Sequence, residues 1–234
     1  MEQNDYFAWR NVTPSMYENY RLPVYLSSTL ASFDKGAAIL DFGCGFGQLL
    51  IALKEAGYEN VEGADINPAA IAHLRSRSIV VHDLSVETVF YEASKSKYDL
   101  VIMSHILEHF PKKDIISLLK KIRDLLKPQG WVIIMVPNAQ SNTGCYWAYE
   151  DFTHETLFTA GSLYYVLRAA GYTSVEFLDV DCTLGVKPLV RVARKILLSI
   201  YRFNYAFWNK VTGSAFHAPT PQIFSYEIKV IARK

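Results

Sequence analysis

A short apolar run that leads into alternating glycines constrains the fold of this chain more than any other stretch. The run covers residues 37–40, and Asp41, Gly43, Gly45 and Gly47 follow it at every second position. A short apolar run bounded by glycine is typical of a buried parallel strand. Glycine permits a tight turn and lets a ligand approach the backbone, and the helix expected next offers N–H groups to that ligand. The stretch therefore predicts a strand, a ligand-binding loop and a helix.

The spacing of the glycines, and the carboxylate before them, distinguish between ligands. Loops that bind dinucleotides have the spacing G-x-G-x-x-G, whereas the third glycine here comes one position earlier. The Asp41 carboxylate would be unfavourable beside a pyrophosphate and favourable beside an ammonium group. The loop alone also fits an ordinary strand-turn-helix, so the choice of ligand rests on the strands that follow.

Further strands are expected downstream, and polar residues stand where they end. The expected strands cover residues 60–65, 78–84 and 98–104, and a fifth one ends near residue 136. Alternation of strand and helix over residues 36–136 predicts a parallel sheet with helices on both faces. Such a sheet binds ligands beyond the carboxyl ends of its strands. The side chains expected to line one crevice there are those of Asp41, Asp65, Asp83, Ser104 and His105.

Taken in order, these segments resemble the motifs of class I methyltransferases that use S-adenosylmethionine. The matching segments include D-x-G-x-G-x-G at residues 41–47, S-H-I-L-E-H at residues 104–109 and L-K-P-Q-G-W at residues 126–131. The resemblance covers roughly residues 36–180 and resumes near the C-terminus. It implies an α/β fold with a Rossmann-like, seven-stranded, mostly parallel sheet and an antiparallel last strand. It also implies S-adenosylmethionine as cofactor and S-adenosylhomocysteine as product.

The resemblance further implies which residues hold the cofactor. Asp65 would accept hydrogen bonds from both ribose hydroxyls, and Gly43 and Gly45 would let the methionine part lie against the backbone. Asp83 would face the adenine amino group, although an Asp at such a position also caps helices. The implied cofactor-binding set is Asp41, Gly43, Cys44, Gly45, Asp65, Ile66, Asp83, Leu84 and Ser104.

The long segment after the fifth strand, residues 137–160, combines aromatic and polar residues. Long ordered loops in a compact domain are usually functional. The patterns D-x-T-H at residues 151–154 and F-T-x-x-S-L at residues 158–163 resemble methyltransferases of bacterial gene clusters for O-antigen and other surface polysaccharides. That resemblance implies O-methylation of a sugar hydroxyl on a small-molecule or lipid-linked glycan. A phosphate, a small aromatic or lipid-like acceptor, and RNA stay open as alternatives.

Methyl transfer to a hydroxyl needs a group that removes the proton, and histidine has its ordinary pKa near neutral pH. His154 is the preferred general base, because its loop is expected to face the methyl group and Asp151 could orient its ring. His105 is the second candidate, and suits a contact to cofactor or substrate better. His109 is expected to pack or to cap a helix. The histidines not expected at the methyl group are His73, His82 and His217.

No metal site is predicted, because a reaction with a positioned base does not require one. Metal-assisted sugar and catechol methyltransferases use clustered carboxylates near the ends of the fourth and fifth strands. Asp151, His154 and Glu155 could imitate such a cluster, since carboxylate and imidazole both ligate divalent metals. A metal-assisted reaction at these three residues is therefore the alternative.

Three other classes of protein fit the sequence less well. An NAD enzyme would carry G-x-G-x-x-G and a Tyr-x-x-x-Lys pair, which this chain lacks at the expected places. Methyltransferases that modify nucleic-acid bases typically have Asn/Asp-Pro-Pro-Tyr/Phe where this chain has S-H-I-L at residues 104–107. Nucleic acid is therefore not an expected partner, although arginines beside aromatic residues can grip a single strand. The retained Asp41, Gly43, Gly45 and Asp65 argue against a scaffold that has lost its cofactor.

The N-terminal arm, residues 1–35, is rich in aromatic residues. The pattern T-P-S at residues 13–15 predicts the start of a helix. We expect the arm to act as a helical lid over the cofactor or substrate, with simple packing against the sheet edge as the alternative. The aromatic residues concerned are Tyr6, Phe7, Trp9, Tyr17, Tyr20 and Tyr25.

Residues 181–221 read as a basic amphipathic insertion between a sixth strand, residues 173–180, and the last strand, residues 222–234. Between Cys182 and Tyr226 there is no Asp or Glu. Six basic residues alternate there with aliphatic and aromatic ones, a pattern typical of a helix on a membrane surface. We expect peripheral membrane contact through residues 187–210, with packing on the domain or on a second subunit of a homodimer as the alternative. The basic residues are Lys187, Arg191, Arg194, Lys195, Arg202 and Lys210.

The composition is that of an ordinary globular protein. A chain of 234 residues suits a single domain with a sizeable core, and a formal charge of +1 indicates neither an acidic nor a basic partner. Its three cysteines have no metal-binding spacing, which favours a reducing compartment. The first five residues lack the features of a signal peptide, and no apolar run reaches the roughly 18 residues of a membrane span. We therefore expect a cytoplasmic protein, with the inner face of the membrane as the place where the insertion would act.

Overall fold

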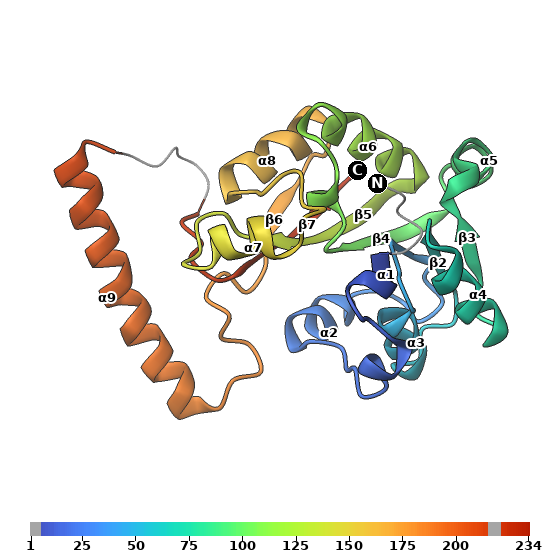
Figure 1. Cartoon of the computed structure of the whole chain (residues 1–234), viewed down its shortest axis with the longest axis horizontal. Helices are drawn as coiled ribbons and strands as arrows, with labels where there is room; N and C mark the ends of the chain where they lie inside the picture. Colours follow the sequence, from blue (N-terminus) through green and yellow to red (C-terminus); the bar gives the residue numbers. More distant parts are fainter. Residues whose placement is uncertain (1–5, 215–220) are drawn as a thin grey trace.

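The computed structural model describes residues 6–214 and 221–234, and a seven-stranded sheet forms its centre (Figure 1). The strand order is β3-β2-β1-β4-β5-β7-β6. Strands β1 to β5 pair in parallel, whereas β7 runs antiparallel to both β5 and β6. The predicted fold class is therefore confirmed, including the antiparallel last strand. The strands are β1 Ile39–Phe42, β2 Val61–Asp65, β3 Val81–Asp83, β4 Tyr98–Ser104, β5 Leu126–Pro137, β6 Val175–Phe177 and β7 Glu227–Arg233.

Helices cover both faces of the sheet (Figure 1). One face is covered by α2, α3 and α4, and the opposite face by α5, α6 and α8. The helices are α1 Tyr6–Trp9, α2 Val24–Leu30, α3 Gln48–Glu55, α4 Pro68–Ser76, α5 Glu87–Ala93, α6 Lys112–Leu125, α7 Gly144–Glu150, α8 Ala160–Ala169 and α9 Pro188–Thr212. Short 3₁₀ turns lie at η2 Pro14–Tyr17, η3 Leu84–Val86 and η4 Leu107–His109.

The central strand β4 shows why the sheet is buried on both faces. Its Leu100 and Ile102 pack into the core under α3, and its Val101 and Met103 pack into the core under α6. Successive side chains of a strand point to opposite faces, so an unbroken apolar run fills both cores at once. Such a run is what an all-apolar parallel strand predicts.

The parallel register brings the ends of the strands to one edge. Asp41 of β1 pairs with Gly63 of β2, and Asp65 of β2 pairs with Asp83 of β3. On the other side of β1, Ser104 ends β4. The predicted convergence of these polar residues on one edge is therefore confirmed for the strands themselves.

Three strands are shorter than the sequence predicts. The third strand, expected over residues 78–84, covers only Val81–Asp83, because Ser78 has a left-handed φ and the N–H of Ile79 binds the carbonyl of Leu74. The last strand begins at Glu227, because the amide of Asn138 binds the carbonyl oxygens of Ile223 and Ser225 at 2.8 Å and holds that segment outside the ladder. The sixth strand ends at Phe177, since Asp179 adopts a left-handed conformation and its carboxylate accepts hydrogen bonds from the turn that follows.

The N-terminal arm divides into a core part and a covering part. Leu26 and Leu30 of α2 are buried in the core, whereas α1 has no buried residue. The ring of Phe7 in α1 lies 4.6 Å from that of Phe46 in the glycine loop, and Arg10 donates a hydrogen bond to the carbonyl of Glu150. The predicted lid can thus involve the part of the arm before α2, because α2 belongs to the core.

The insertion contains one long helix, α9, which stands apart at the side of the molecule (Figure 1). None of its 25 residues is buried. One side contacts the body: the rings of Tyr201 and Tyr205 pack against Phe224, and Arg202 pairs with Asp181. In the described ranges, no helix is both long enough and apolar enough to cross a bilayer.

Candidate cofactor and acceptor site

The glycine loop after β1 has the backbone shape that its sequence predicts. Gly43 and Gly47 have φ angles of 79° and 81°, in the left-handed region that favours glycine. A Cβ atom on Gly43 would lie 2.1 Å from the Cδ1 atom of Ile106, and one on Gly47 would lie 2.3 Å from the Cδ2 atom of Leu74. Both positions therefore require glycine, for conformation and for space.

Asp65, at the end of β2, is tied to the glycine loop through its carboxylate. Its Oδ2 accepts the N–H of Gly45 at 2.7 Å, and its Oδ1 accepts the N–H of Asn67 at 2.8 Å. Burial raises the pKa of Asp65, and these backbone N–H groups oppose the rise. Each oxygen keeps a second lone pair, which suits the implied contact with ribose hydroxyls. The side chain of Ile66 beside it is exposed.

Asp41 is the other carboxylate of this half of the site. It is 2% exposed, and burial, followed by the charge of Asp65, raises its pKa to about 8. A cation beside Asp41 would favour the charged carboxylate, which is what the ammonium group expected from the sequence would do. Cys44 in the same loop is buried, and burial raises the pKa of its thiol, so it packs as a neutral side chain.

Asp83 at the end of β3 caps the turn that follows it. Its Oδ1 accepts hydrogen bonds from the backbone N–H of Ser85 at 2.9 Å and from its hydroxyl at 2.6 Å, and the two bonds lower the pKa of Asp83. The capping role that the sequence left open is therefore present. Leu84 packs at the rim of the core, and the implied contacts of both residues with adenine stay predictions.

His105 follows Ser104 at the end of β4 and adopts a left-handed conformation, with φ at 54°. Its Nε2 lies 2.8 Å from Oε1 of Glu227, and its Nδ1 lies 3.3 Å from Oε1 of Glu108. Burial opposes protonation of the ring, but the two carboxylates outweigh it and raise the pKa of His105 to about 10. A ring that already carries its proton at neutral pH is poorly suited to act as a base, although it suits a contact to an anionic group.

His154 lies in the turn after α7, and its orientation differs from the expected one. The sequence suggested that Asp151 would orient the ring, yet His154 Nε2 is 4.0 Å from Asp151 Oδ2, beyond hydrogen-bonding distance. The Nδ1 of His154 instead lies 2.6 Å from the carbonyl oxygen of Trp147. Asp151 is occupied elsewhere, because it accepts hydrogen bonds from the hydroxyls of Tyr6 at 2.5 Å and Thr153 at 2.6 Å.

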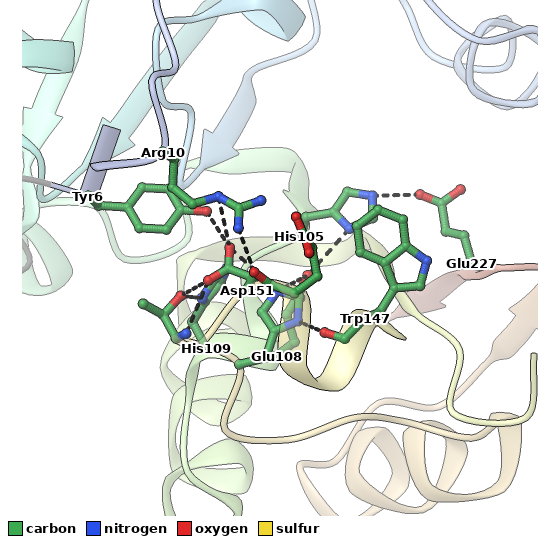
Figure 2. Close-up of polar contacts among 11 residues, drawn as sticks. Tyr6, Arg10, His105, Glu108, His109, Trp147, Asp151 and Glu227 are labelled. Atoms are coloured by element: carbon green, nitrogen blue, oxygen red, sulfur yellow. Dashed lines mark hydrogen bonds and ion pairs between the residues drawn. The ribbon is translucent and has the colours of Figure 1, made fainter. Parts of the chain in front are cut away.

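Glu108 and His109 complete a cluster that the sequence did not single out (Figure 2). Glu108 is 0% exposed, and in the described residues neither oxygen of its carboxylate has a hydrogen-bond partner. Its Oε1 lies 4.0 Å from Nε2 of His154. The Nδ1 of His109 lies 2.8 Å from Oγ1 of Thr153, and its ring centroid lies 4.8 Å from that of His154. Burial lowers the pKa of His109, so this ring is neutral at neutral pH.

The metal-ligand set that the sequence offered is therefore replaced by another. Within the described ranges, one ligand atom from each of Glu108, His109 and His154 lies within 4.8 Å of the other two. Glu155, by contrast, is exposed, although its backbone N–H donates to the carbonyl oxygen of Glu108 at 2.9 Å. The adjacent pair Glu108-His109, in the short turn that follows β4, was the available signal for this cluster.

Two of the three remaining histidines are described, and they lie where the sequence placed them, away from the cluster. His73 on α4 packs edge-on against Phe46, and His82 on β3 bonds to Glu62 of β2 at 2.8 Å. His217 lies outside the described residues.

Comparisons with known proteins support the same family. A family model described as "Methyltransferase domain" matches residues 17–176. An S-adenosylmethionine-dependent methyltransferase from Archaeoglobus fulgidus superposes with a TM-score of 0.67 at 20% identity, covering 98% of this chain and 99% of the other. Phosphoethanolamine N-methyltransferase 2 from Haemonchus contortus, solved with S-adenosylmethionine, gives a TM-score of 0.65 at 15% identity, covering 100% of this chain and 60% of the other.

A curated relative adds a similarity in sequence. The ubiquinone biosynthesis O-methyltransferase of Bordetella avium is 32% identical over 120 residues, which are 47% of this chain and 46% of that protein. The matched part thus spans less than half of the relative. The family model, in contrast, covers more than half of this chain, and its range includes the glycine loop, Asp65 and the cluster. The chain accordingly belongs to the methyltransferase domain family, and its fold is that of S-adenosylmethionine-dependent methyltransferases.

Proposed function

We propose that this enzyme transfers the methyl group of S-adenosylmethionine to a hydroxyl oxygen, with His154 as the general base. The observation that carries the proposal is the orientation of His154: its Nδ1 faces the Trp147 carbonyl at 2.6 Å, which can only accept a hydrogen bond. In the neutral ring, Nε2 therefore holds a lone pair. The hydroxyl proton passes to Nε2, the oxygen forms the new O–C bond, and the electron pair of the S–C bond stays on sulfur.

The proposed acceptor is a sugar hydroxyl of a surface-polysaccharide precursor, O-antigen or capsule. It rests on the D-x-T-H pattern of residues 151–154, whose Asp151 and His154 both face the cluster. A lipid-like aromatic phenol is the second candidate acceptor, and the similarity to an enzyme named ubiquinone biosynthesis O-methyltransferase favours it. Both acceptors present a hydroxyl, so the same base serves either one.

We also propose that α9 lies on an anionic membrane and brings a lipid-linked acceptor to the site. The side of α9 away from the body is an apolar stripe, formed by Leu189, Ile196, Ile200, Phe203 and Phe207, each more than half exposed. The six basic residues of the insertion, with no Asp or Glu between Cys182 and Tyr226, favour anionic lipid. Two such helices facing each other in a homodimer would bring like charges together, which makes self-association the weaker alternative.

A variant pair tests the base. His154→Ala should keep its affinity for S-adenosylmethionine within about twofold and lower turnover by roughly 10²-fold or more, the usual range for loss of a general base. Glu155→Gln, the next residue with an exposed side chain, is the matched control and should stay near wild type. Turnover is measured as release of S-adenosylhomocysteine with lipid-linked glycan and with phenolic acceptors in parallel, and the O-methylated position is located by NMR. Near-normal turnover of His154→Ala at saturating acceptor would remove His154 from this role.

Flotation with vesicles tests the membrane contact. Binding should rise with the fraction of anionic lipid and fall with salt, and Phe203→Asp should weaken it by placing a charge on the apolar stripe. Thr212→Asp, an exposed position half a turn around the same helix from Phe203, is the control for added charge alone. A dimer in solution that does not bind vesicles at low salt would favour the self-association alternative.

A further inference from the structure

One ligand atom from each of Glu108, His109 and His154 lies within 4.8 Å of the other two, and the hydrogen bonds of the two rings indicate which nitrogens carry protons (Figure 2). The Trp147 carbonyl takes the Nδ1–H of His154. Thr153 has a single hydroxyl proton, which it donates to Oδ1 of Asp151 at 2.6 Å. Its oxygen must therefore accept from Nδ1 of His109, 2.8 Å away. Both rings thus have their proton on Nδ1 and a lone pair on Nε2.

The burial of the third member of the cluster, Glu108, is compensated in the described part of the chain only by an ion pair with His105. Glu108 is fully buried, and within the described residues its carboxylate oxygens accept no hydrogen bond. His105 approaches Oε1 at 3.3 Å but binds Glu227 more closely, at 2.8 Å. A buried carboxylate without hydrogen bonds is costly, and a cation held between it and two imidazoles would remove that cost.

We propose that Glu108, His109 and His154 bind a divalent cation of the first transition row, such as Mn²⁺ or Zn²⁺. Two imidazole nitrogens and one carboxylate oxygen are a ligand set that suits these ions. Each imidazole has the outer partner that metal-ligating histidines have: a backbone carbonyl for His154, and a hydroxyl backed by the Asp151 carboxylate for His109. Tyr6 of the N-terminal arm donates to the same Asp151 and closes this outer layer.

The catalytic consequence of the site rests on the proposed reaction, methyl transfer to a hydroxyl, but it replaces the role of His154 as the base. Three protein ligands leave coordination positions open, and an acceptor hydroxyl bound there loses its proton more readily. The proton goes to solvent water, the oxygen pair forms the O–C bond, and the S–C pair stays on sulfur. His154 then contributes Nε2 to the cation instead of taking the proton.

The test begins with binding, which needs no acceptor. Tag-free protein is treated with chelator and dialysed, and MnCl₂ or ZnCl₂ is titrated by calorimetry, with the Mn²⁺ paramagnetic resonance signal as a second readout. We expect one equivalent per chain, and at least tenfold weaker binding in Glu108→Gln and in His109→Ala. Glu155→Gln, the ligand that the sequence alone would have chosen, should bind like wild type. Calorimetry with S-adenosylmethionine verifies that each variant is folded.

The outcomes separate this site from the proposed function. Saturable binding that is lost in Glu108→Gln supports the site even if no hydroxyl acceptor is methylated. Absence of saturable binding for both ions, or equal affinity in Glu108→Gln and wild type, overturns the site. Undiminished hydroxyl methylation by chelator-treated enzyme also overturns the catalytic consequence and leaves His154 as the base.

Discussion

The two halves of the ligand-binding edge, the cofactor half around Asp65 and the acceptor half around Glu108, differ in how their buried carboxylates are hydrogen-bonded. On the cofactor half, Asp65 accepts backbone N–H groups from Gly45 and Asn67, so its buried carboxylate is satisfied before any ligand arrives. On the acceptor half, Glu108 is equally buried but accepts no hydrogen bond in the described residues. The first half is pre-organised by its own backbone, whereas the second presents unsatisfied groups to whatever enters. The difference fits the proposed roles, in which the first half holds the cofactor and the second half carries out the methyl transfer.

The largest expected effect is on the cofactor half. Asp65→Ala should weaken binding of S-adenosylmethionine by about 2–4 kcal/mol, because the ribose hydroxyls lose their acceptor and the loop loses the contact with Gly45. Asp83→Ala is the matched control: its carboxylate caps the neighbouring turn, and a smaller loss is expected. Calorimetric titration of both variants measures the difference. Unchanged affinity in a folded Asp65→Ala protein would remove the assignment of this half.

The cofactor half was predictable from sequence because its chemistry is local. The glycine loop must turn tightly wherever it occurs. Asp65 contacts this loop because it ends the strand that pairs directly with β1. The predicted parallel order of β1, β2 and β4 followed from alternating strand and helix, and the structure confirms it. Amphipathic residues likewise predicted the helix that α9 forms. Each of these features depends on residues that are neighbours in sequence or in the sheet.

The acceptor half was less predictable, since its partners meet through loops. His154 reaches Glu108 because residues 151–154 form a turn, and that turn also moves Asp151 to Tyr6. No periodicity in the sequence indicates that the Trp147 carbonyl would take the place expected for Asp151. Glu108 looks like an ordinary turn residue until its burial is known. Sequence thus brought His154 to attention as a candidate base, which stays a prediction, but it indicated neither the orientation nor the neighbours of the ring.

The pH dependence of cofactor binding tests whether Asp41, on the cofactor half, makes an ionic contact with the ammonium group. The pKa of Asp41 is raised to about 8 by burial and by Asp65, whereas the bound ammonium group requires the carboxylate. Below pH 8, binding must therefore release a proton, so affinity should rise with pH, by about 20-fold between pH 6 and pH 8. Above pH 8 the free amino group, with a pKa of about 7.8, loses its own proton and affinity should fall.

The control for this profile is Asp41→Asn. In this variant the rise of affinity below pH 8 should disappear. The fall of affinity above pH 8 should remain, because it comes from the amino group of the ligand. Calorimetry from pH 6 to pH 9 gives both limbs. A flat profile in wild type would contradict an ionic contact at Asp41.

The N-terminal arm touches both halves, and Tyr6→Phe tests whether it couples them. The hydroxyl of Tyr6 donates to Asp151 at 2.5 Å, while Phe7 packs on the glycine loop. Loss of that hydrogen bond should cost about 1 kcal/mol of arm closure, which is roughly a fivefold decrease in kcat/KM. The dissociation constant of S-adenosylmethionine should change less than twofold. Tyr17→Phe in the next turn of the arm is the control, and equal losses in both variants would argue against a specific role for the contact.

The smallest expected effect is on the free energy of unfolding. Removing the carboxylate of the acceptor half should raise it, whereas removing that of the cofactor half should lower it. Glu108→Met replaces a fully buried carboxylate, without a hydrogen bond in the described residues, by an apolar side chain of similar volume. Among the residues that the structure describes, the buried Glu108 accepts no hydrogen bond and has only His105 as a charged partner, which keeps Glu227 as its own partner. The free energy of unfolding at pH 7 should therefore rise by about 1 kcal/mol, although methyl transfer should be lost. Asp65→Asn on the other half should lower stability instead, since its carboxylate is already satisfied by backbone N–H groups. Urea unfolding of cofactor-free and chelator-treated proteins measures both changes. If Glu108→Met were destabilised as much as Asp65→Asn, Glu108 would be a satisfied structural residue, and the contrast between the two halves would not hold.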